Sequence, residues 1–254
     1  MNHELRFYSV VWCLWAVVAM AVVPYLLLRP APYGRHSRKG FGPLVGARLA
    51  WLFMEAPSPL LMIVYFLLGR RPYGAVAIVF LALWLCHYVY RAFLFPLLLP
   101  ATSRPMPVLV LASGALFNVV NAYLNGRWLF SLAEPRALMW LASPQFVAGA
   151  LLFFFGFCVH VLADRELRRL RIASGGERAL PRGPLFHFVS CPNYFGEIVE
   201  WIGFALATWS PGGLLFALWT AANLVPRALH HHRWYREKFP DYPPARRAVA
   251  PFLF

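Results

Sequence analysis

The segment Pro192–Trp201 reads PNYFGEIVEW and carries one amide and two carboxylates within an otherwise apolar stretch. Proline suits the first position of a helix, so we expect a helix to begin at Pro192. Asn193, Glu197 and Glu200 then stand at i, i+4 and i+7 and share one face of that helix. A polar face on an apolar helix indicates a pocket rather than contact with lipid.

Two other segments carry polar faces with the same helical spacing. The face near the C-terminus steps by four residues and consists of Arg227, His231 and Tyr235. The third face consists of His160, Asp164, Arg168 and Arg171. If the three faces converge at one membrane boundary, they form a polar pocket rich in arginine.

The composition of the 254-residue chain is that of an integral membrane protein, since 60% of the residues are hydrophobic and only 13% are charged. A helix crosses a hydrocarbon layer about 30 Å thick with about 20 residues. Seven apolar runs suit this role, approximately at residues 7–28, 44–68, 74–98, 108–124, 146–162, 194–209 and 214–229. The predicted fold is an all-α membrane protein with seven transmembrane helices. Short connections without a linker or repeat predict one domain, residues 1–254.

The first apolar run contains Ala19-Met20-Ala21, which resembles a signal-peptidase site. The run continues past this site through Leu26–Leu28. We therefore expect a retained helix rather than a cleaved signal.

The positions of the 24 basic residues predict the orientation, because cytoplasmic loops retain arginine and lysine. With the N-terminus outside or in the lumen, and the C-terminus in the cytoplasm, nineteen basic residues lie on the cytoplasmic side. The five remaining outside are Arg6, Arg70, Arg71, Arg127 and Arg136. An even number of helices would separate the basic C-terminal tail from the basic loops.

The net charge of +14 has more than one explanation. Basic residues orient a membrane protein and attract anionic lipid. However, all but two of the 24 are arginine, and arginine is the side chain that grips phosphate oxygens with two parallel donors. A genome that favours arginine codons gives the same excess, so the two causes remain open.

Glu55 lies among apolar residues in the second run, where an ionised carboxylate is costly to bury. It either joins helices through a hydrogen bond or faces a polar functional cavity, and we favour the cavity. Pro57 and Pro59 should bend or break the helix just after this acid.

Other polar residues in the apolar runs are weaker candidates. Tyr88 and Arg91 share a helix face near the end of the third run, and a tyrosine hydroxyl can donate a proton to a carbonyl. Asn118 begins a polar stripe with Asn121 and Asn125, which helix packing explains as well as ligand binding does. Tyr33 either covers a ligand's ring or anchors the headgroup region.

The sequence contains neither a metal-binding motif nor a glycine-rich nucleotide-binding loop. The four cysteines are far apart, and three consecutive histidines, His230–His232, point in different directions on a helix and cannot ligate one ion together. No Gly-rich phosphate loop follows a strand, so side chains of membrane helices and their loops must hold any nucleotide. We predict no metal.

Several motifs resemble the steroid 5α-reductases, the 3-oxo-5α-steroid 4-dehydrogenases. They are PRGPLF at 181–186, NYFGE at 193–197, EWIG at 200–203, RALHHHRWY at 227–235 and DYP at 241–243. The resemblance runs from the loop containing Tyr33 to Pro251-Phe252 and includes Trp51, Glu55, His87-Tyr88 and Arg104-Pro105, so it covers nearly the whole chain.

The resemblance implies seven transmembrane helices, NADPH as hydride donor, and reduction of the Δ4 double bond of 3-oxo steroids. It implies Glu55 and Tyr88 as catalytic residues. For the cofactor it implies Asp164, Arg171, Asn193, Glu197, Arg227, His231 and Tyr235, with Arg91 and Arg104 near the phosphates and nicotinamide. We add Tyr33, His160 and Arg168 to the expected cofactor site.

Two positions depart from the family pattern. Met54 stands where a glutamine often precedes the catalytic glutamate, and His160 stands where the family has an asparagine. The first change removes a hydrogen-bonding group from the steroid end, so it bears on substrate preference more than on reaction type. We expect Trp51, Phe53, Met54 and Asn118 to bind the substrate.

Three other function classes remain as alternatives. Reductases of other sterols or of enoyl lipids use the same hydride chemistry. An S-adenosylmethionine-dependent membrane methyltransferase fits less well, because its cationic sulfonium suits an arginine-rich pocket poorly. A non-enzymatic lipid carrier or transporter leaves the aligned polar faces without a role, and the inverted repeat of many transporters is missing.

The expected partners are a steroid or sterol-like lipid and the bilayer, with no nucleic acid, and we expect a monomer. The expected location is the inner membrane for a bacterial source or the endoplasmic reticulum membrane for a eukaryotic one.

Overall fold

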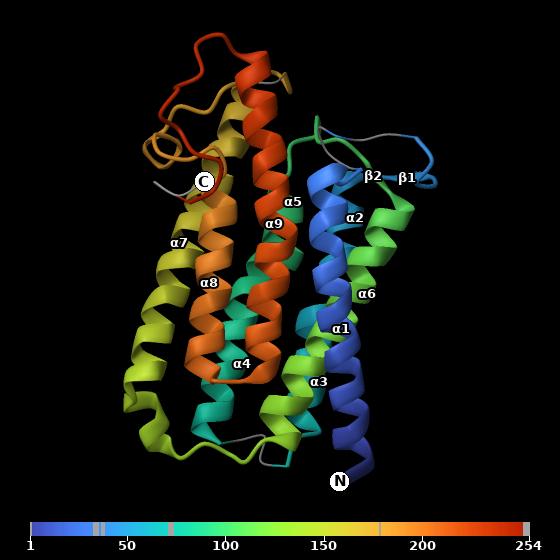
Figure 1. Cartoon of the computed structure of the whole chain (residues 1–254), viewed down its shortest axis with the longest axis vertical. Helices are drawn as coiled ribbons and strands as arrows, with labels where there is room; N and C mark the ends of the chain where they lie inside the picture. The colour runs from blue at the N-terminus through green and yellow to red at the C-terminus, as the bar shows by residue number, and fades with distance from the viewer. Residues whose placement is uncertain (1, 33–35, 37–38, 71–73, 178, 251–254) are drawn as a thin grey trace.

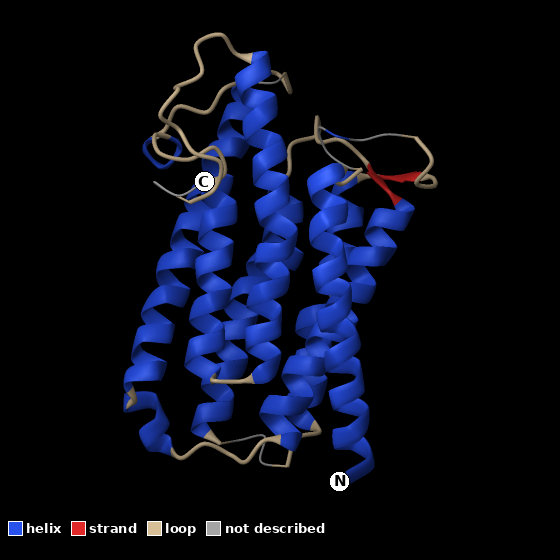
Figure 2. Cartoon of the chain, viewed as in Figure 1, coloured by secondary structure: helices blue, strands red, loops and turns tan. Residues whose placement is uncertain are grey.

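The computed structural model describes residues 2–32, 36, 39–70, 74–177 and 179–250, and its long helices run along one axis of an elongated bundle (Figure 1). The helices are α1 Asn2–Leu28, α2 Ala47–Glu55, α3 Pro57–Leu67, α4 Ala75–Tyr88, α5 Phe95–Leu98, α6 Val108–Arg127, α7 Pro144–Ala173, α8 Pro192–Thr208 and α9 Pro211–Lys238. Loops gather at the two ends of the bundle (Figure 2). The N-terminus lies at one end, and α7 and α9 extend furthest at the other (Figure 1).

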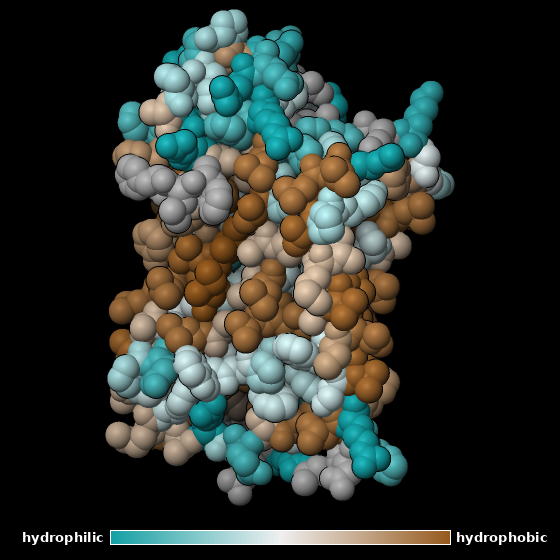
Figure 3. Space-filling model, viewed as in Figure 1, coloured by the Kyte–Doolittle hydropathy of each residue, from teal (hydrophilic) through white to brown (hydrophobic). Residues whose placement is uncertain are grey.

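Among the described residues, five helical segments are long and apolar enough to cross a membrane. They are His3–Leu28, Ala47–Leu67, Ala75–Leu98, Val108–Leu132 and Pro144–Ala173. Hydrophobic residues form a band across the middle of the face seen in Figure 3, between hydrophilic ends. Each of the seven predicted apolar runs is mostly helical, and the last two form most of α8 and α9.

The second predicted run is interrupted just after Glu55, as the two prolines predicted, and its first two residues form a strand rather than a helix. Strand β1, Leu44–Val45, precedes α2, and α2 ends at Glu55 before α3 begins at Pro57. Pro57 and Pro59 lack the N–H groups that would continue the hydrogen-bond ladder. At this interruption the Met54 carbonyl accepts a hydrogen bond of 2.8 Å from the Asn118 side chain.

Among the departures from regular α-helix in the described residues, two lie near the polar residues of α2 and α4 and were not predicted. β1 pairs antiparallel with β2, Met106–Pro107, so the described residues contain a short strand pair that the all-α prediction lacks. The third run changes after Tyr88 from α-helix to a π-helical turn, Val89–Leu94. π-helical turns occur frequently at functional sites, and this one carries Arg91.

Helices α7 and α8 touch through their backbones. A Cβ atom at Gly156 would lie 2.4 Å from the Glu200 nitrogen and 2.5 Å from the Gly196 oxygen. A Cβ atom at Gly196 would lie 2.5 Å from the His160 nitrogen. Only glycine permits this approach, which fixes the polar faces of α7 and α8 relative to each other.

The C-terminal segment after α9 returns to the start of α8. The backbone of Ser190 donates to the Arg247 carbonyl at 2.8 Å. The Ser190 hydroxyl lies 2.9 Å from His232 Nδ1 and 2.6 Å from the Tyr242 hydroxyl. These contacts hold the segment against the first turn of α8.

The contacts of His232 predict a pH-dependent stability. Burial, followed by the charges of Arg236, Arg246 and Arg247, lowers the pKa of His232 below its usual value. The unfolded chain then binds the proton more readily, so this contribution is fully present above about pH 6.5 and is lost as the pH falls from there through the lower folded pKa. We expect the unfolding temperature to drop between about pH 7.5 and pH 5.5, and to drop less in His232→Asn, which cannot titrate. Equal drops in the two proteins would contradict this assignment.

Candidate active site

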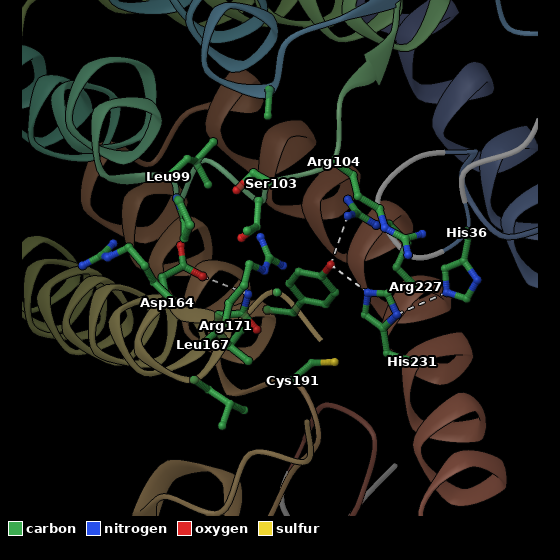
Figure 4. A pocket seen from close by; sticks show the side chains of 18 of the residues that line it. His36, Leu99, Ser103, Arg104, Asp164, Leu167, Arg171, Cys191, Arg227 and His231 are labelled. Atoms are coloured by element: carbon green, nitrogen blue, oxygen red, sulfur yellow. Dashed lines mark hydrogen bonds between the residues drawn. The ribbon is translucent and has the colours of Figure 1, made fainter. Parts of the chain in front are cut away.

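A cavity of about 310 Å³ opens among α7, α8, α9 and the segment 99–106, at the end of the bundle away from the N-terminus. Nine of the predicted cofactor residues line it: Arg91, Arg104, Asp164, Arg168, Arg171, Asn193, Arg227, His231 and Tyr235. Figure 4 shows Asp164 and Arg171 from α7, and Arg227 and His231 from α9, around the same cavity. Residues of all three polar faces therefore meet at this cavity, although Asn193 is the residue of the α8 face that lines it.

On the α9 side, Tyr194 connects the predicted residues. Its hydroxyl accepts a hydrogen bond of 3.0 Å from Arg227 Nη2 and lies 3.3 Å from His231 Nε2. His231 Nδ1 in turn lies 3.3 Å from His36 Nε2 (Figure 4). Tyr194 and His36 were missed as site residues. Tyr194 lies in the first turn of the PNYFGE helix and could have been suspected, whereas His36 lies in a loop without periodicity.

On the α7 side, Asp164 joins the other two polar faces. Its Oδ1 accepts a hydrogen bond of 3.1 Å from Asn193 Nδ2, which ties the start of α8 to α7. Its Oδ2 lies 3.8 Å from Arg91 Nη1 and 3.4 Å from His160 Nε2. Asp164 therefore offers an ordered carboxylate at the wall of a cavity whose charged lining is mainly cationic.

A second polar cluster lies deeper in the bundle and contains Glu55, Tyr88 and Asn118. Asn118 Nδ2 donates to the Met54 carbonyl at 2.8 Å and to Glu55 Oε2 at 3.0 Å. A backbone carbonyl can only accept, so the amide nitrogen must face it and the amide oxygen must face the other way. That oxygen accepts a hydrogen bond of 3.1 Å from the Tyr88 hydroxyl. Tyr88 and Glu55 are thus linked through Asn118.

Arg91 connects this inner cluster with the cavity. Its Nε lies 3.6 Å from Glu55 Oε1, while its Nη1 faces Asp164. The guanidinium lies over the ring of Trp51 at 4.4 Å and the ring of Phe95 at 4.9 Å. Arg91 is one of the lining residues, so the inner carboxylate is one side chain away from the cavity.

Some predicted residues do not line the cavity. Phe53 is 59% exposed and faces away from Glu55, as expected for residues two apart on a helix. His160 is buried behind Asp164, and Glu197 lies 4.0 Å from His160 Nε2. Met54 packs against Gly114 of α6. Tyr33 lies outside the described residues.

The three asparagines of α6 divide between the two roles considered from the sequence, ligand binding and helix packing. Asn118 joins the Glu55 and Tyr88 cluster, whereas Asn125 donates to the Asn121 side chain at 3.0 Å within α6. Two further buried residues were not predicted as site residues: His87 and Glu200, whose side chains form a hydrogen bond of 2.9 Å. Glu200 shares the helix face of Asn193 and Glu197, and that spacing was the available signal.

Comparison with known proteins shows similar sequences in one enzyme family. Residues 104–254 match the family model described as 3-oxo-5-alpha-steroid 4-dehydrogenase. The chain is 37% identical to a steroid 5-alpha-reductase of Arabidopsis thaliana and 41% identical to one of Gossypium hirsutum, with 96% of each chain covered in both comparisons. It is 40% identical to 3-oxo-5-alpha-steroid 4-dehydrogenase 1 of Bos taurus, over 92% of this chain and 93% of the relative. The chain therefore belongs to the 3-oxo-5-alpha-steroid 4-dehydrogenase family, the steroid 5α-reductases.

Proposed function

We propose that the protein reduces the Δ4 double bond of 3-oxo steroids to 5α-dihydro steroids with NADPH. The observation that carries this proposal is the hydrogen-bonded chain from Tyr88 through Asn118 to Glu55, which Arg91 connects to an arginine-lined cavity. The chain provides a hydroxyl donor for a carbonyl group, and the cavity provides cations for phosphates. The names of the relatives given above support the same reaction.

The hydrogen-bond donors that line the cavity suit NADPH. Arg91, Arg104, Arg168, Arg171 and Arg227 line it, which suits a ligand with three phosphate groups. Arg168 Nη1 is buried and has no hydrogen-bond partner among the described residues, so the site contains a donor that an anion would satisfy. Asp164 and Asn193 offer partners for ribose hydroxyls or a carboxamide.

Conjugate reduction of an enone needs an electrophile at the carbonyl oxygen, where negative charge develops. Bound NADPH would supply the hydride for the β-carbon, and the α-carbon would take the second hydrogen as a proton from water. The Tyr88 hydroxyl has one proton, which it turns from the Asn118 oxygen to the carbonyl oxygen of the bound substrate, where it stabilises the developing negative charge. Before the substrate arrives, Asn118 accepts from the hydroxyl and Glu55 accepts from Asn118, so the Tyr88 side chain is held in place until its proton changes acceptor.

The steroid site in this proposal adjoins α2. Trp51 lines the cavity at the end near Arg91, and Met54 closes the α6 side without offering a hydrogen-bond donor. A steroid dissolved in the lipid reaches this region from the side of the bundle. Phe53, which faces outward, would contact a steroid only on this approach.

We also propose that α8 and α9 complete seven membrane crossings in a single domain, residues 1–254, with the N-terminus outside and the C-terminus in the cytoplasm. The two helices are enclosed in the same bundle as the five apolar segments (Figure 1). The arginine-lined cavity lies at the end of the bundle away from the N-terminus, so it opens to the cytoplasm, where NADPH is available. The proposed unit is a monomer without a metal.

The proposed function is tested with purified protein, a Δ4-3-oxo steroid and NADPH. We expect consumption of NADPH and a product heavier by two hydrogens, while the saturated 5α-3-oxo steroid consumes no NADPH. Reduction of a sterol or enoyl lipid without reduction of the steroid would favour the neighbouring reductase class. Binding of S-adenosylmethionine without binding of NADPH would reject the proposal.

Loss of a cavity arginine should weaken cofactor binding. Arg171→Ala and Arg227→Ala each remove a charged contact worth about 1.5–3 kcal/mol, which corresponds to an increase of about 10- to 100-fold in the NADPH dissociation constant. Arg182→Ala is the matched control, because Arg182 is 64% exposed, pairs with Asp241 and does not line the cavity. Fluorescence titration with NADPH measures the constants. Unchanged NADPH affinity in both variants would show that these two arginines do not bind the phosphates.

A further inference from the structure

Glu200 is fully buried and joins histidines from two other helices. Its Oε1 lies 2.9 Å from His87 Nδ1 on α4, and its Oε2 lies 3.4 Å from His160 Nδ1 on α7. The exposed fractions of Glu200, His87 and His160 are 0%, 2% and 1%. A buried carboxylate is costly unless its oxygens are paired, and here a different histidine faces each oxygen.

The two ring nitrogens of His160 face acids on opposite sides. Nδ1 faces Glu200, while Nε2 lies 3.4 Å from Asp164 Oδ2 and 4.0 Å from Glu197 Oε2. Only the Nδ1 contact is a hydrogen bond, whereas Nε2 meets its acids as ion-pair contacts, and acids on both sides of the ring favour its protonated form. Charges therefore alternate from Asp164 at the cavity wall, through His160, to Glu200 in the core.

On its other side, Glu200 holds the last turn of α4. His87 precedes Tyr88 in sequence, and the two rings meet edge-on at 4.9 Å. Trp201, the residue after Glu200, packs on the rings of both His87 and Tyr88, with centroids 4.6 Å and 5.9 Å away. The helix changes to the π-helical turn directly after Tyr88, so the His87 contact anchors the last regular turn.

Helices α7 and α8 are fixed together by direct backbone contact at Gly156 and Gly196, whereas α4 meets them through side chains such as Trp84 and His87. The hydrogen bond from His87 to Glu200 thus helps to fix the position of the end of α4 relative to α7 and α8, which carry Asp164 and Asn193.

We propose that Glu200 is a positioning residue, whose buried bridge to His87 and His160 sets the place of Tyr88 relative to Asp164. This role rests on the proposed function, in which Tyr88 meets the substrate and Asp164 lies at the cofactor cavity. The bridge fixes the distance between the two halves of the reaction without touching either reactant.

Two replacements of His87 by neutral amides test the bridge. His87→Asn keeps an N–H near the position of Nδ1, facing Glu200, whereas His87→Gln moves its N–H to the position of Nε2 and leaves Oε1 without a donor. We expect the single-turnover hydride transfer of His87→Gln to be about 10- to 100-fold slower than in the parent, and His87→Asn to restore most of that loss. His187→Asn, at an exposed histidine, controls for histidine replacement. Equal rates in His87→Asn and His87→Gln would overturn the proposal.

A second measurement separates positioning from general destabilisation. If the bridge acts through Tyr88, His87→Gln should slow the residual reaction less than about twofold in a Tyr88→Phe background. A full, additive loss in that background would also overturn the proposal. NADPH affinity should stay near that of the parent in both His87 variants.

The same three side chains offer ligand atoms within 4.8 Å of one another, a spacing that a metal ion would also accept. Loss of parental activity on treatment with a chelator, restored by zinc, would therefore replace the proposed bridge by a metal site. If the parent itself reduces no steroid, the proposed function fails. Thermal unfolding then still tests the bridge, because His87→Gln must have a lower unfolding temperature than His87→Asn.

Discussion

Tyr88→Phe is expected to slow hydride transfer to a Δ4-3-oxo steroid by about 10²–10³-fold, because it removes the proposed donor to the developing enolate. Phenylalanine keeps the ring that stacks on Trp84 at 5.1 Å and packs on Trp201. The buried ring should therefore stay in place, and the loss reports the hydroxyl group. Single-turnover kinetics at saturating NADPH measures the rate.

Binding of NADPH should remain near that of the parent in Tyr88→Phe, since Tyr88 does not line the described cavity. A rate close to that of the parent would exclude Tyr88 as the electrophile. A parallel loss of NADPH affinity would instead show that the substitution disturbs the cofactor site.

Glu55→Gln completes this test. Glutamine keeps the size of the side chain and one oxygen that can accept from Asn118 Nδ2, but it removes the charge that faces Arg91. Because Tyr88, Asn118 and Glu55 form one hydrogen-bonded chain, the double variant should be scarcely slower than the slower single variant. If the decrease in rate of the double variant equalled the product of the two single decreases, the residues would act separately.

Gly156→Ala is expected to damage folding and the site together. The new Cβ would meet backbone atoms of Gly196 and Glu200 at 2.4–2.8 Å, and backbone cannot move aside as a side chain can. Helices α7 and α8 must separate, and overpacking of this kind costs about 1–3 kcal/mol. The separation also lengthens the bonds from Asp164 to Asn193 and from His160 to Glu200, so we expect weaker NADPH binding in the protein that still folds.

Gly46→Ala is the control for this substitution, because a Cβ atom at Gly46 meets no atom within 4 Å. Its unfolding temperature and NADPH affinity should match those of the parent. A Gly156→Ala protein with the stability and affinity of the parent would show that α7 and α8 are not held by this contact.

The local elements of this fold follow from the sequence. Apolar runs longer than about 16 residues form helices because a helix satisfies its own backbone hydrogen bonds in lipid. The start of α8 at Pro192 and the interruption before Pro57 follow from the missing N–H of proline. The i, i+4 spacing shows which polar residues share a face within each helix, and the same spacing could have excluded Phe53.

The sequence by itself thus determined which residues share a helix face and the family to which the chain belongs. Only the tertiary structure decided which faces meet: Asn118 between Tyr88 and Glu55, Arg91 between the inner cluster and the cavity, and Glu200 between two histidines. These contacts join residues up to 113 positions apart in the chain. The physical reason is that periodicity fixes directions within one helix, whereas the rotation of one helix against another depends on close contacts such as those of Gly156 and Gly196 and on the π-helical turn after Tyr88.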